Sequence, residues 1–164
     1  MANEHGARPT ESAHHLGGVR FPPPALYLLG LLAGIVLEIV VGSGDLPFPF
    51  AVIAAVIGVS MFTVLSGGAL SLFTRSGTSP IPATPATALV TTGPYRYTRN
   101  PMYLGLAFLY AGIALAFGLL WALAALPVVL LVVDRVVIPP EERHLEARFG
   151  DEYRAYKTRV RRWI

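Results

Sequence analysis

The chain has 164 residues, of which 54% are hydrophobic and 14% are charged, and it contains no cysteine. One soluble core of this size cannot bury so much apolar surface, so the composition excludes an ordinary soluble domain and favours a membrane protein. The lack of cysteine excludes disulfides, thiolate metal sites and a cysteine nucleophile. The net charge of +3 does not indicate nucleic acid as a partner, because basic residues cluster beside apolar segments, where membrane topology and lipid headgroups explain them.

Residues 1–24 are polar and rich in His, Gly and Pro, and they lack the short cationic start of a secretory signal peptide. We predict a disordered N-terminal tail here. His5, His14 and His15 are interpreted as incidental to such a tail, so we expect no metal site.

Four apolar segments follow, and each is close to the length of about 20 residues that crosses a bilayer as a helix. They are residues 25–42, 48–73, 101–118 and 119–139. The last two have almost no polar break between them, so they should fold back as a helical hairpin around residues 117–120. The expected fold is therefore an all-α integral membrane protein, with residues 25–164 as one domain that has four transmembrane helices, including this C-terminal hairpin.

The distribution of charge predicts the orientation of these spans. Four crossings place both termini on one side. Arg75, Arg96 and Arg99 lie in the middle connection and seven Lys or Arg follow Glu141, whereas residues 42–47 carry only Asp45. The positive-inside rule then makes the middle loop and both tails cytoplasmic. The short form favours a prokaryotic plasma membrane as the location.

Two polar segments flank the hairpin. The middle loop, residues 74–100, is rich in Ser, Thr and Pro, so we expect it to be extended rather than helical. After Pro139 and Pro140, a helix start signal, residues 140–164 should form an amphipathic cytoplasmic tail, either as one helix or as two broken at Gly150. Its aromatic stripe is interpreted as packing on the membrane interface, with a lid role left open for Tyr153. The stripe comprises Leu145, Phe149, Tyr153, Tyr156, Val160 and Trp163.

The most distinctive string is Gly93-Pro-Tyr-Arg-Tyr-Thr-Arg-Asn-Pro-Met-Tyr-Leu-Gly105, which leads into the third span. It could be a belt at the membrane interface, since Tyr and Arg both favour headgroup depth. That interpretation leaves a second polar cluster unexplained, Glu141-Glu142-Arg143 at the end of the fourth span. Because a hairpin places its two ends side by side, we expect the two clusters to form one site.

The two clusters, with Phe149-Gly150 and the Tyr153 and Tyr156 tail, resemble the isoprenylcysteine carboxyl methyltransferase and phospholipid methyltransferase superfamily over roughly residues 91–163. The resemblance implies transfer of a methyl group from S-adenosylmethionine to a lipophilic acceptor that enters from the bilayer. It also implies a cofactor pocket between the hairpin and the C-terminal segment. One departure is Asn100, which stands where the usual motif has His and which cannot titrate as His does.

The chemistry of the cofactor suggests which groups could hold it. S-adenosylmethionine carries a sulfonium, an ammonium, a carboxylate and ribose hydroxyls, so its site needs anionic and cationic partners. Glu142 and Glu141 could accept from the ammonium or the ribose. Arg99 or Arg96 could pair with the carboxylate.

Aromatic and polar neighbours complete the expected site. Tyr103 and Tyr95 could offer ring faces to the sulfonium or hydroxyls to the carboxylate, and Asn100 is assigned to positioning the cofactor. In-line methyl transfer depends chiefly on alignment, so the sequence fixes no catalytic residue, and Arg135 and Glu142 are candidates. The residues expected to bind cofactor are Gly93, Tyr95, Arg99, Asn100, Pro101, Tyr103, Glu141 and Glu142.

Several alternatives stay open. The acceptor could be a prenylcysteine-like carboxylate, a phospholipid amine or a small hydrophobic thiol. A membrane reductase that uses NADPH has a similar hairpin. The two phosphates of the dinucleotide, however, need more basic residues and glycines than this loop has. A non-enzymatic transport or partner protein would carry polar residues along facing helices. Glu38, inside the first span, is expected to have a partner or to reach the membrane surface, and we leave it out of the site.

Overall fold

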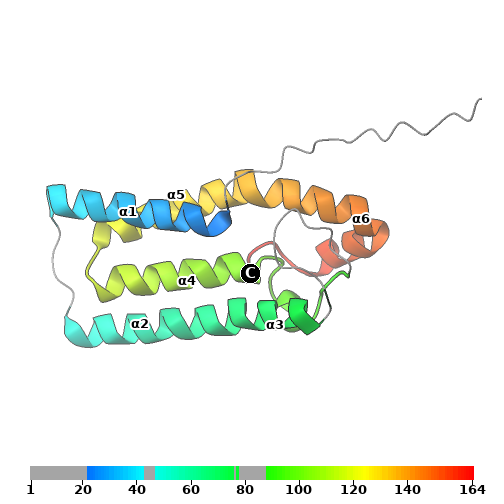
Figure 1. Ribbon diagram of the computed structural model, residues 1–164, viewed down its shortest axis with the longest axis horizontal. Helices are drawn as coiled ribbons and strands as arrows, with labels where there is room; N and C mark the ends of the chain where they lie inside the picture. The colour runs from blue at the N-terminus through cyan, green and yellow to red at the C-terminus, as the bar shows by residue number, and fades with distance from the viewer. Residues whose placement is uncertain (1–21, 43–46, 76, 78–87) are drawn as a thin grey trace, which may run out of the picture.

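The computed structural model describes residues 22–42, 47–75, 77 and 88–164, and all regular structure within these residues is helical (Figure 1). Most of the predicted N-terminal tail, with His5, His14 and His15, lies outside the described residues. In chain order the elements are α1 (Pro23–Val41), α2 (Phe48–Phe62), the π-helical η1 (Thr63–Gly67), α3 (Gly68–Arg75), the 3-10 turn η2 (Gly93–Arg96), α4 (Pro101–Ala116), α5 (Leu120–Val132), the π-helical η3 (Val133–Val137) and α6 (Ile138–Arg159).

Three of the continuous helical stretches are long and apolar enough to cross a membrane. They run from Pro23 to Val41, from Phe48 to Arg75 and from Leu120 to Arg159, and the shorter apolar helix α4 accompanies them. Many of their apolar side chains face outward, with Ile39 80% exposed and Val40 76% exposed. Such surface is stable only in an apolar solvent, so the structure agrees with the membrane character predicted from composition.

The predicted hairpin is confirmed. Helix α4 ends at Ala116, α5 begins at Leu120, and the two helices contact each other. Gly118 turns the chain between them with a φ of 66°, a left-handed conformation that favours glycine. The Tyr110 hydroxyl donates to the Ala122 carbonyl at 2.8 Å, which fastens the two arms to each other.

Residues without a side chain, or with a small one, let the helices approach closely. Gly58 of α2 faces Gly112 of α4, and Gly34 of α1 lies against Ala122 of α5. Helix α4 also contacts α1 and α5, so it lies at the centre of the bundle, as Figure 1 shows. In this view α1 and α4 run in one direction, and α2 and α5 run in the opposite direction.

Glu38 has a partner in the bundle. Its Oε2 accepts from the backbone N–H of Trp121 at 3.1 Å, and the Trp121 indole donates to the Gly42 carbonyl at 3.1 Å. Trp121 lies in the first turn of α5, where backbone N–H groups have no acceptor within the helix. The Glu38 carboxylate therefore caps the start of α5 from α1. It lies at the opposite end of the bundle from the polar residues of the predicted site.

The polar segments gather at the opposite end of the bundle, where α3, η2 and α6 lie (Figure 1). Part of the middle loop, residues 78–87, lies outside the described residues. The expectation that this loop would be extended is wrong for Gly93–Arg96, which forms the 3-10 turn η2.

The expected new helix start after Pro139 and Pro140 is also wrong. The helix that begins as α5 runs through η3 into α6 without a break. The π-helical turn η3 directly before these prolines changes the hydrogen-bond register, which accommodates residues that lack an N–H. Of the two alternatives for the tail, the structure supports the break at Gly150, since its φ of 53° and ψ of −123° are not helical.

Tyr153 and Tyr156 of the aromatic stripe pack inside the protein, which corrects for these two residues the interpretation that they lie on the membrane surface. Tyr153 is 2% exposed and Tyr156 is 4% exposed. The second arm of α6, after Gly150, turns back toward the bundle in Figure 1. The Tyr156 hydroxyl donates to the Tyr95 carbonyl at 2.8 Å, near the end of the middle loop. Helix α6 ends at Arg159 and Val160 is extended, so Val160 and Trp163 do not continue the helical stripe.

Replacement of Gly112 by Ala should destabilise the protein. The new Cβ would lie 2.9 Å from the Cα of Gly58 and 3.0 Å from the carbonyl oxygen of Ala54, so α2 and α4 would have to separate. We expect the free energy of unfolding to fall by about 1–3 kcal/mol, measured by thermal unfolding in detergent. Gly67→Ala is the matched control, because no heavy atom lies within 4 Å of its added Cβ. Equal melting temperatures for the two variants would contradict this account of the packing.

Candidate functional site

The two polar clusters predicted to meet do meet. The Tyr103 hydroxyl in the first turn of α4 donates to Glu141 Oε1 at 2.6 Å. Arg99, just before α4, places Nη1 3.2 Å from Glu142 Oε1. Glu141 lies in the first turn of α6 and Glu142 directly follows it, so the start of α4 faces the start of α6.

The start of α4 is held from two sides. The Tyr27 hydroxyl of α1 donates to the Tyr103 carbonyl at 2.9 Å, and the Ser66 hydroxyl of η1 donates to the Met102 carbonyl at 3.2 Å. Gly105 has no Cβ, which leaves the room that Ser66 occupies. Pro101 is buried in this first turn, where a missing N–H costs nothing. The bundle thus fixes the backbone that carries Arg99 and Tyr103.

Glu142 is buried and its carboxylate is shared between two guanidinium groups. It is 8% exposed. Besides Arg99, Arg162 reaches Oε2 with Nη2 at 2.7 Å and Oε1 with Nε at 3.3 Å. A carboxylate engaged in this way on both oxygens is well compensated, and little of it is left for a ligand.

Arg99 is less completely satisfied than Glu142. Its side chain is 12% exposed, yet its Nε has no hydrogen-bond acceptor within the part of the chain that the structure describes. Buried N–H donors in proteins nearly always have a partner. The Arg99 side chain also hydrogen-bonds Tyr153, so its unused hydrogen-bonding capacity is confined to buried donors such as Nε.

Glu141 is a buried acid and so complements the buried Arg99 guanidinium. Burial raises the pKa of its carboxyl above the usual value of 4.5, the hydrogen bond from Tyr103 opposes this rise, and the nearby Glu142 adds to it. A buried carboxylate whose pKa is raised gains from a cation brought beside it. The site thus offers one buried acid suited to a cation and one buried guanidinium suited to an anion.

Tyr95 and Gly93 form the loop wall next to these groups. The Tyr95 ring packs edge-on against Phe73 with 5.8 Å between ring centroids, and its carbonyl accepts from the Tyr156 hydroxyl at 2.8 Å. Burial raises the pKa of Tyr95, with smaller contributions from Tyr156 and Glu141. Gly93 turns the loop with a φ of 59°, and a Cβ there would meet Leu72 at 2.8 Å. The Tyr95 phenol, with its raised pKa, stays neutral at physiological pH.

Two other predicted residues are placed differently. The Asn100 amide donates to the Arg162 carbonyl at 3.0 Å, so this side chain is engaged by the C-terminal segment. Arg135 has a side chain that is 73% exposed, with its Nε 3.3 Å from its neighbour Asp134. The structure therefore does not bring Arg135 into the group formed by Arg99, Tyr103 and Glu141.

The same polar cluster contains four residues that were not predicted as part of the site. They are Thr98, Asp134, Arg162 and Trp163. Arg162 and Trp163 both contact the Asp134 carboxylate, at 3.2 and 2.9 Å. The available signal was Asp134 itself, because a carboxylate near the end of an apolar span needs a cationic partner. The sequence could not indicate which basic residue of the tail would reach it.

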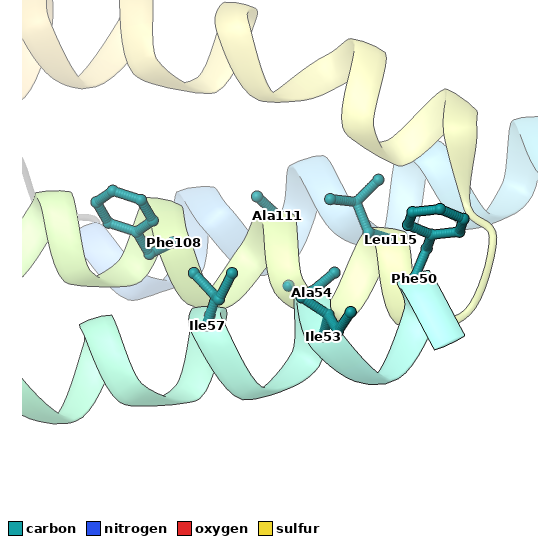
Figure 2. Close-up of a pocket in the computed structure, with 9 residues that line it drawn as sticks. Phe50, Ile53, Ala54, Ile57, Phe108, Ala111 and Leu115 are labelled. Atoms are coloured by element: carbon teal, nitrogen blue, oxygen red, sulfur yellow. The ribbon is translucent and has the colours of Figure 1, made fainter. Parts of the chain in front are cut away.

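An apolar cavity of about 500 Å³ lies between α2 and α4 (Figure 2). None of the polar site residues lines it. Its walls include Phe50 and Ile57 of α2 and Phe108 and Leu115 of α4, with Gly58 and Gly112 between the helices. In Figure 2 the labelled side chains come from both helices and lie along the line where α2 and α4 meet.

The apolar helices and the polar site at one end fit an integral membrane protein. A family model described as phospholipid methyltransferase matches residues 49–152, which is more than half of the chain. The chain therefore belongs to the phospholipid methyltransferase family, which confirms the resemblance seen in its motifs and indicates a membrane methyltransferase. Methyltransferases of this family generally use S-adenosylmethionine.

An uncharacterized protein of Haemophilus influenzae is 41% identical over 63 residues, which are 38% of this chain and all of the relative. No solved structure matches the chain.

Proposed function

We propose that this protein transfers a methyl group from S-adenosylmethionine to a lipophilic acceptor, at a site between η2, the start of α4 and the start of α6. One observation carries the proposal. A buried guanidinium with an unused donor, Arg99, and a buried carboxylate with a raised pKa, Glu141, lie in one small site of a chain that belongs to a methyltransferase family.

The donor set fits the amino-acid portion of the cofactor. Arg99 would receive its carboxylate, because a guanidinium recognises that group with paired N–H donors. Glu141 would receive its ammonium, with Tyr103 holding the acid in place. Glu142 would act on Arg99 rather than on the cofactor, because both its oxygens already contact guanidinium groups.

The loop residues would complete the pocket. Tyr95 and Tyr103 could present ring faces or hydroxyls to the sulfonium end, and Gly93 and Pro101 would shape the loop and the helix start that carry them. When bound, S-adenosylmethionine supplies the electrophilic methyl group. Asn100 cannot move a proton at physiological pH, so the contribution of these residues is orientation and exclusion of water.

The acceptor is a lipid or another lipophilic molecule in this proposal, and a prenylcysteine-like carboxylate, a phospholipid amine and a small hydrophobic thiol are the three classes to screen. A carboxylate acceptor needs no general base, whereas a protonated amine or a thiol must lose a proton. A reductase that uses NADPH is less well supported, because Arg162 is committed to Asp134 and Glu142, which leaves Arg99 and the exposed Arg96 to serve two phosphates.

Calorimetric titration of the detergent-solubilised protein with S-adenosylhomocysteine tests the proposal. We expect saturable binding to the wild-type protein, and binding about tenfold weaker for Glu141→Gln, which loses the charge that pairs with the ammonium. Binding should also weaken as the pH falls through the raised pKa of Glu141, because protonation removes the same charge. The variant should lack this pH dependence.

Arg135→Ala is the control, since its exposed side chain lies away from the site and its loss should leave binding unchanged. A preference for NADPH, or a failure of the wild-type protein to bind S-adenosylhomocysteine, would contradict the proposal.

The same proposal places the site and both ends of the described chain on the cytoplasmic side of a prokaryotic plasma membrane, with four crossings. The native chain has no cysteine, so single-cysteine variants report position cleanly. A membrane-impermeant maleimide should label Ser43→Cys in intact bacterial cells, and Thr158→Cys only after permeabilisation, because the basic segments stay inside. The reverse pattern would overturn this orientation, and equal labelling of both would overturn the four crossings.

A further inference from the structure

The segment Val160–Trp163 follows α6 and lies against the loop that precedes α4; we name it the C-terminal strap. The Arg99 N–H donates to the Arg161 carbonyl at 3.0 Å. The Thr98 hydroxyl and the Asn100 amide both donate to the Arg162 carbonyl at 3.0 Å. The strap lies beyond residue 152, where the family match ends.

Side chains of the strap also bind the carboxylates of the polar cluster. Arg162 contacts Glu142 at 2.7 Å and Asp134 at 3.2 Å, and Trp163 donates to Asp134 at 2.9 Å. The local charges are balanced, because the carboxylates of Asp134, Glu141 and Glu142 are matched by the guanidinium groups of Arg99 and Arg162 and by the exposed Arg135 beside Asp134. Arg99 and Arg162 are therefore each needed to compensate a partly or fully buried anion.

This balance limits how strongly Glu142 can hold Arg99. Arg162 occupies Glu142 Oε2, so Arg99 meets Glu142 at Oε1 and its Nε stays without an acceptor in the described residues. Without Arg162, both oxygens of Glu142 would be free to form a bidentate pair with Arg99, the strongest arrangement these two groups can make. The donors of Arg99 would then be used up inside the protein.

We propose that Arg162 is a positioning residue for the anionic end of the ligand, because it restrains Glu142 and so keeps donors of Arg99 available. This inference rests on the proposed function, since the anion in question is the carboxylate of the S-adenosyl ligand. It assigns a role in ligand binding to a side chain of the strap, outside the part of the chain that the family match covers.

Two probes separate this role from a merely structural one. S-adenosylhomocysteine carries the amino-acid carboxylate, whereas 5′-methylthioadenosine has the same nucleoside and thioether without it. For Arg162→Ala we expect S-adenosylhomocysteine to bind about tenfold more weakly or worse, and 5′-methylthioadenosine to bind as it does to the wild-type protein. Calorimetry supplies both affinities, and thermal unfolding checks that the variant is folded.

A second substitution tests whether Arg162 affects Arg99 through Glu142. In the double variant Arg162→Ala with Glu142→Gln, the carboxylate that would capture Arg99 is gone, so S-adenosylhomocysteine should bind more tightly than to Arg162→Ala alone. Arg159→Ala removes an exposed arginine at the end of α6 and should change neither affinity. If Arg162→Ala does not fold, Arg162→Lys serves instead, because a single ammonium cannot span both carboxylates and should give a smaller loss of the same selectivity.

Equal weakening of both probes, or a double variant that binds no better than the single one, would overturn this inference and leave the strap a structural element. Unchanged binding of S-adenosylhomocysteine to folded Arg162→Ala would overturn it as well. If the wild-type protein binds no S-adenosylhomocysteine, the proposed function and the inference fail together, and that outcome is distinct from the others.

Discussion

Glu142 is a carboxylate buried near the end of an apolar helix bundle, and it stays compensated only because two arginines from distant parts of the chain reach it. An unpaired charge in such a position costs about 3–5 kcal/mol. Arg99 comes from the loop before α4 and Arg162 from the C-terminal strap, so satisfying this one carboxylate draws the loop, α6 and the strap together. The arrangement of the candidate site follows from that requirement.

The bundle supplies the rigidity that this polar cluster needs. Gly58 and Gly112 bring α2 and α4 into contact, and Ser66 then binds the first turn of α4 where Gly105 leaves room. The bend at Gly150 returns the second arm of α6, so that Tyr156 closes over the loop at Tyr95. Small residues thus determine where the charged residues lie.

Much of this could be predicted from the sequence, and the misses have physical causes. The apolar segments and the hairpin followed from hydropathy, and the meeting of Tyr103 with Glu141 followed from the hairpin. The π-helical turn before Pro139 was missed because proline normally starts a helix, and sequence periodicity does not reveal a change of hydrogen-bond register. Arg162 was missed because seven similar basic residues follow Glu141, and only tertiary packing selects one as the partner of Glu142.

The most direct test of the central claim is amide hydrogen exchange of the intact, detergent-solubilised protein with and without S-adenosylhomocysteine. If the ligand binds between the loop and the two helix starts, exchange should slow in the non-proline residues of 93–103 and at Glu141 and Glu142 of α6. The distant end of the bundle around Glu38 and Trp121 should stay unchanged. Protection confined to other segments, or no protection at a ligand concentration that saturates binding, would contradict the placement of the site.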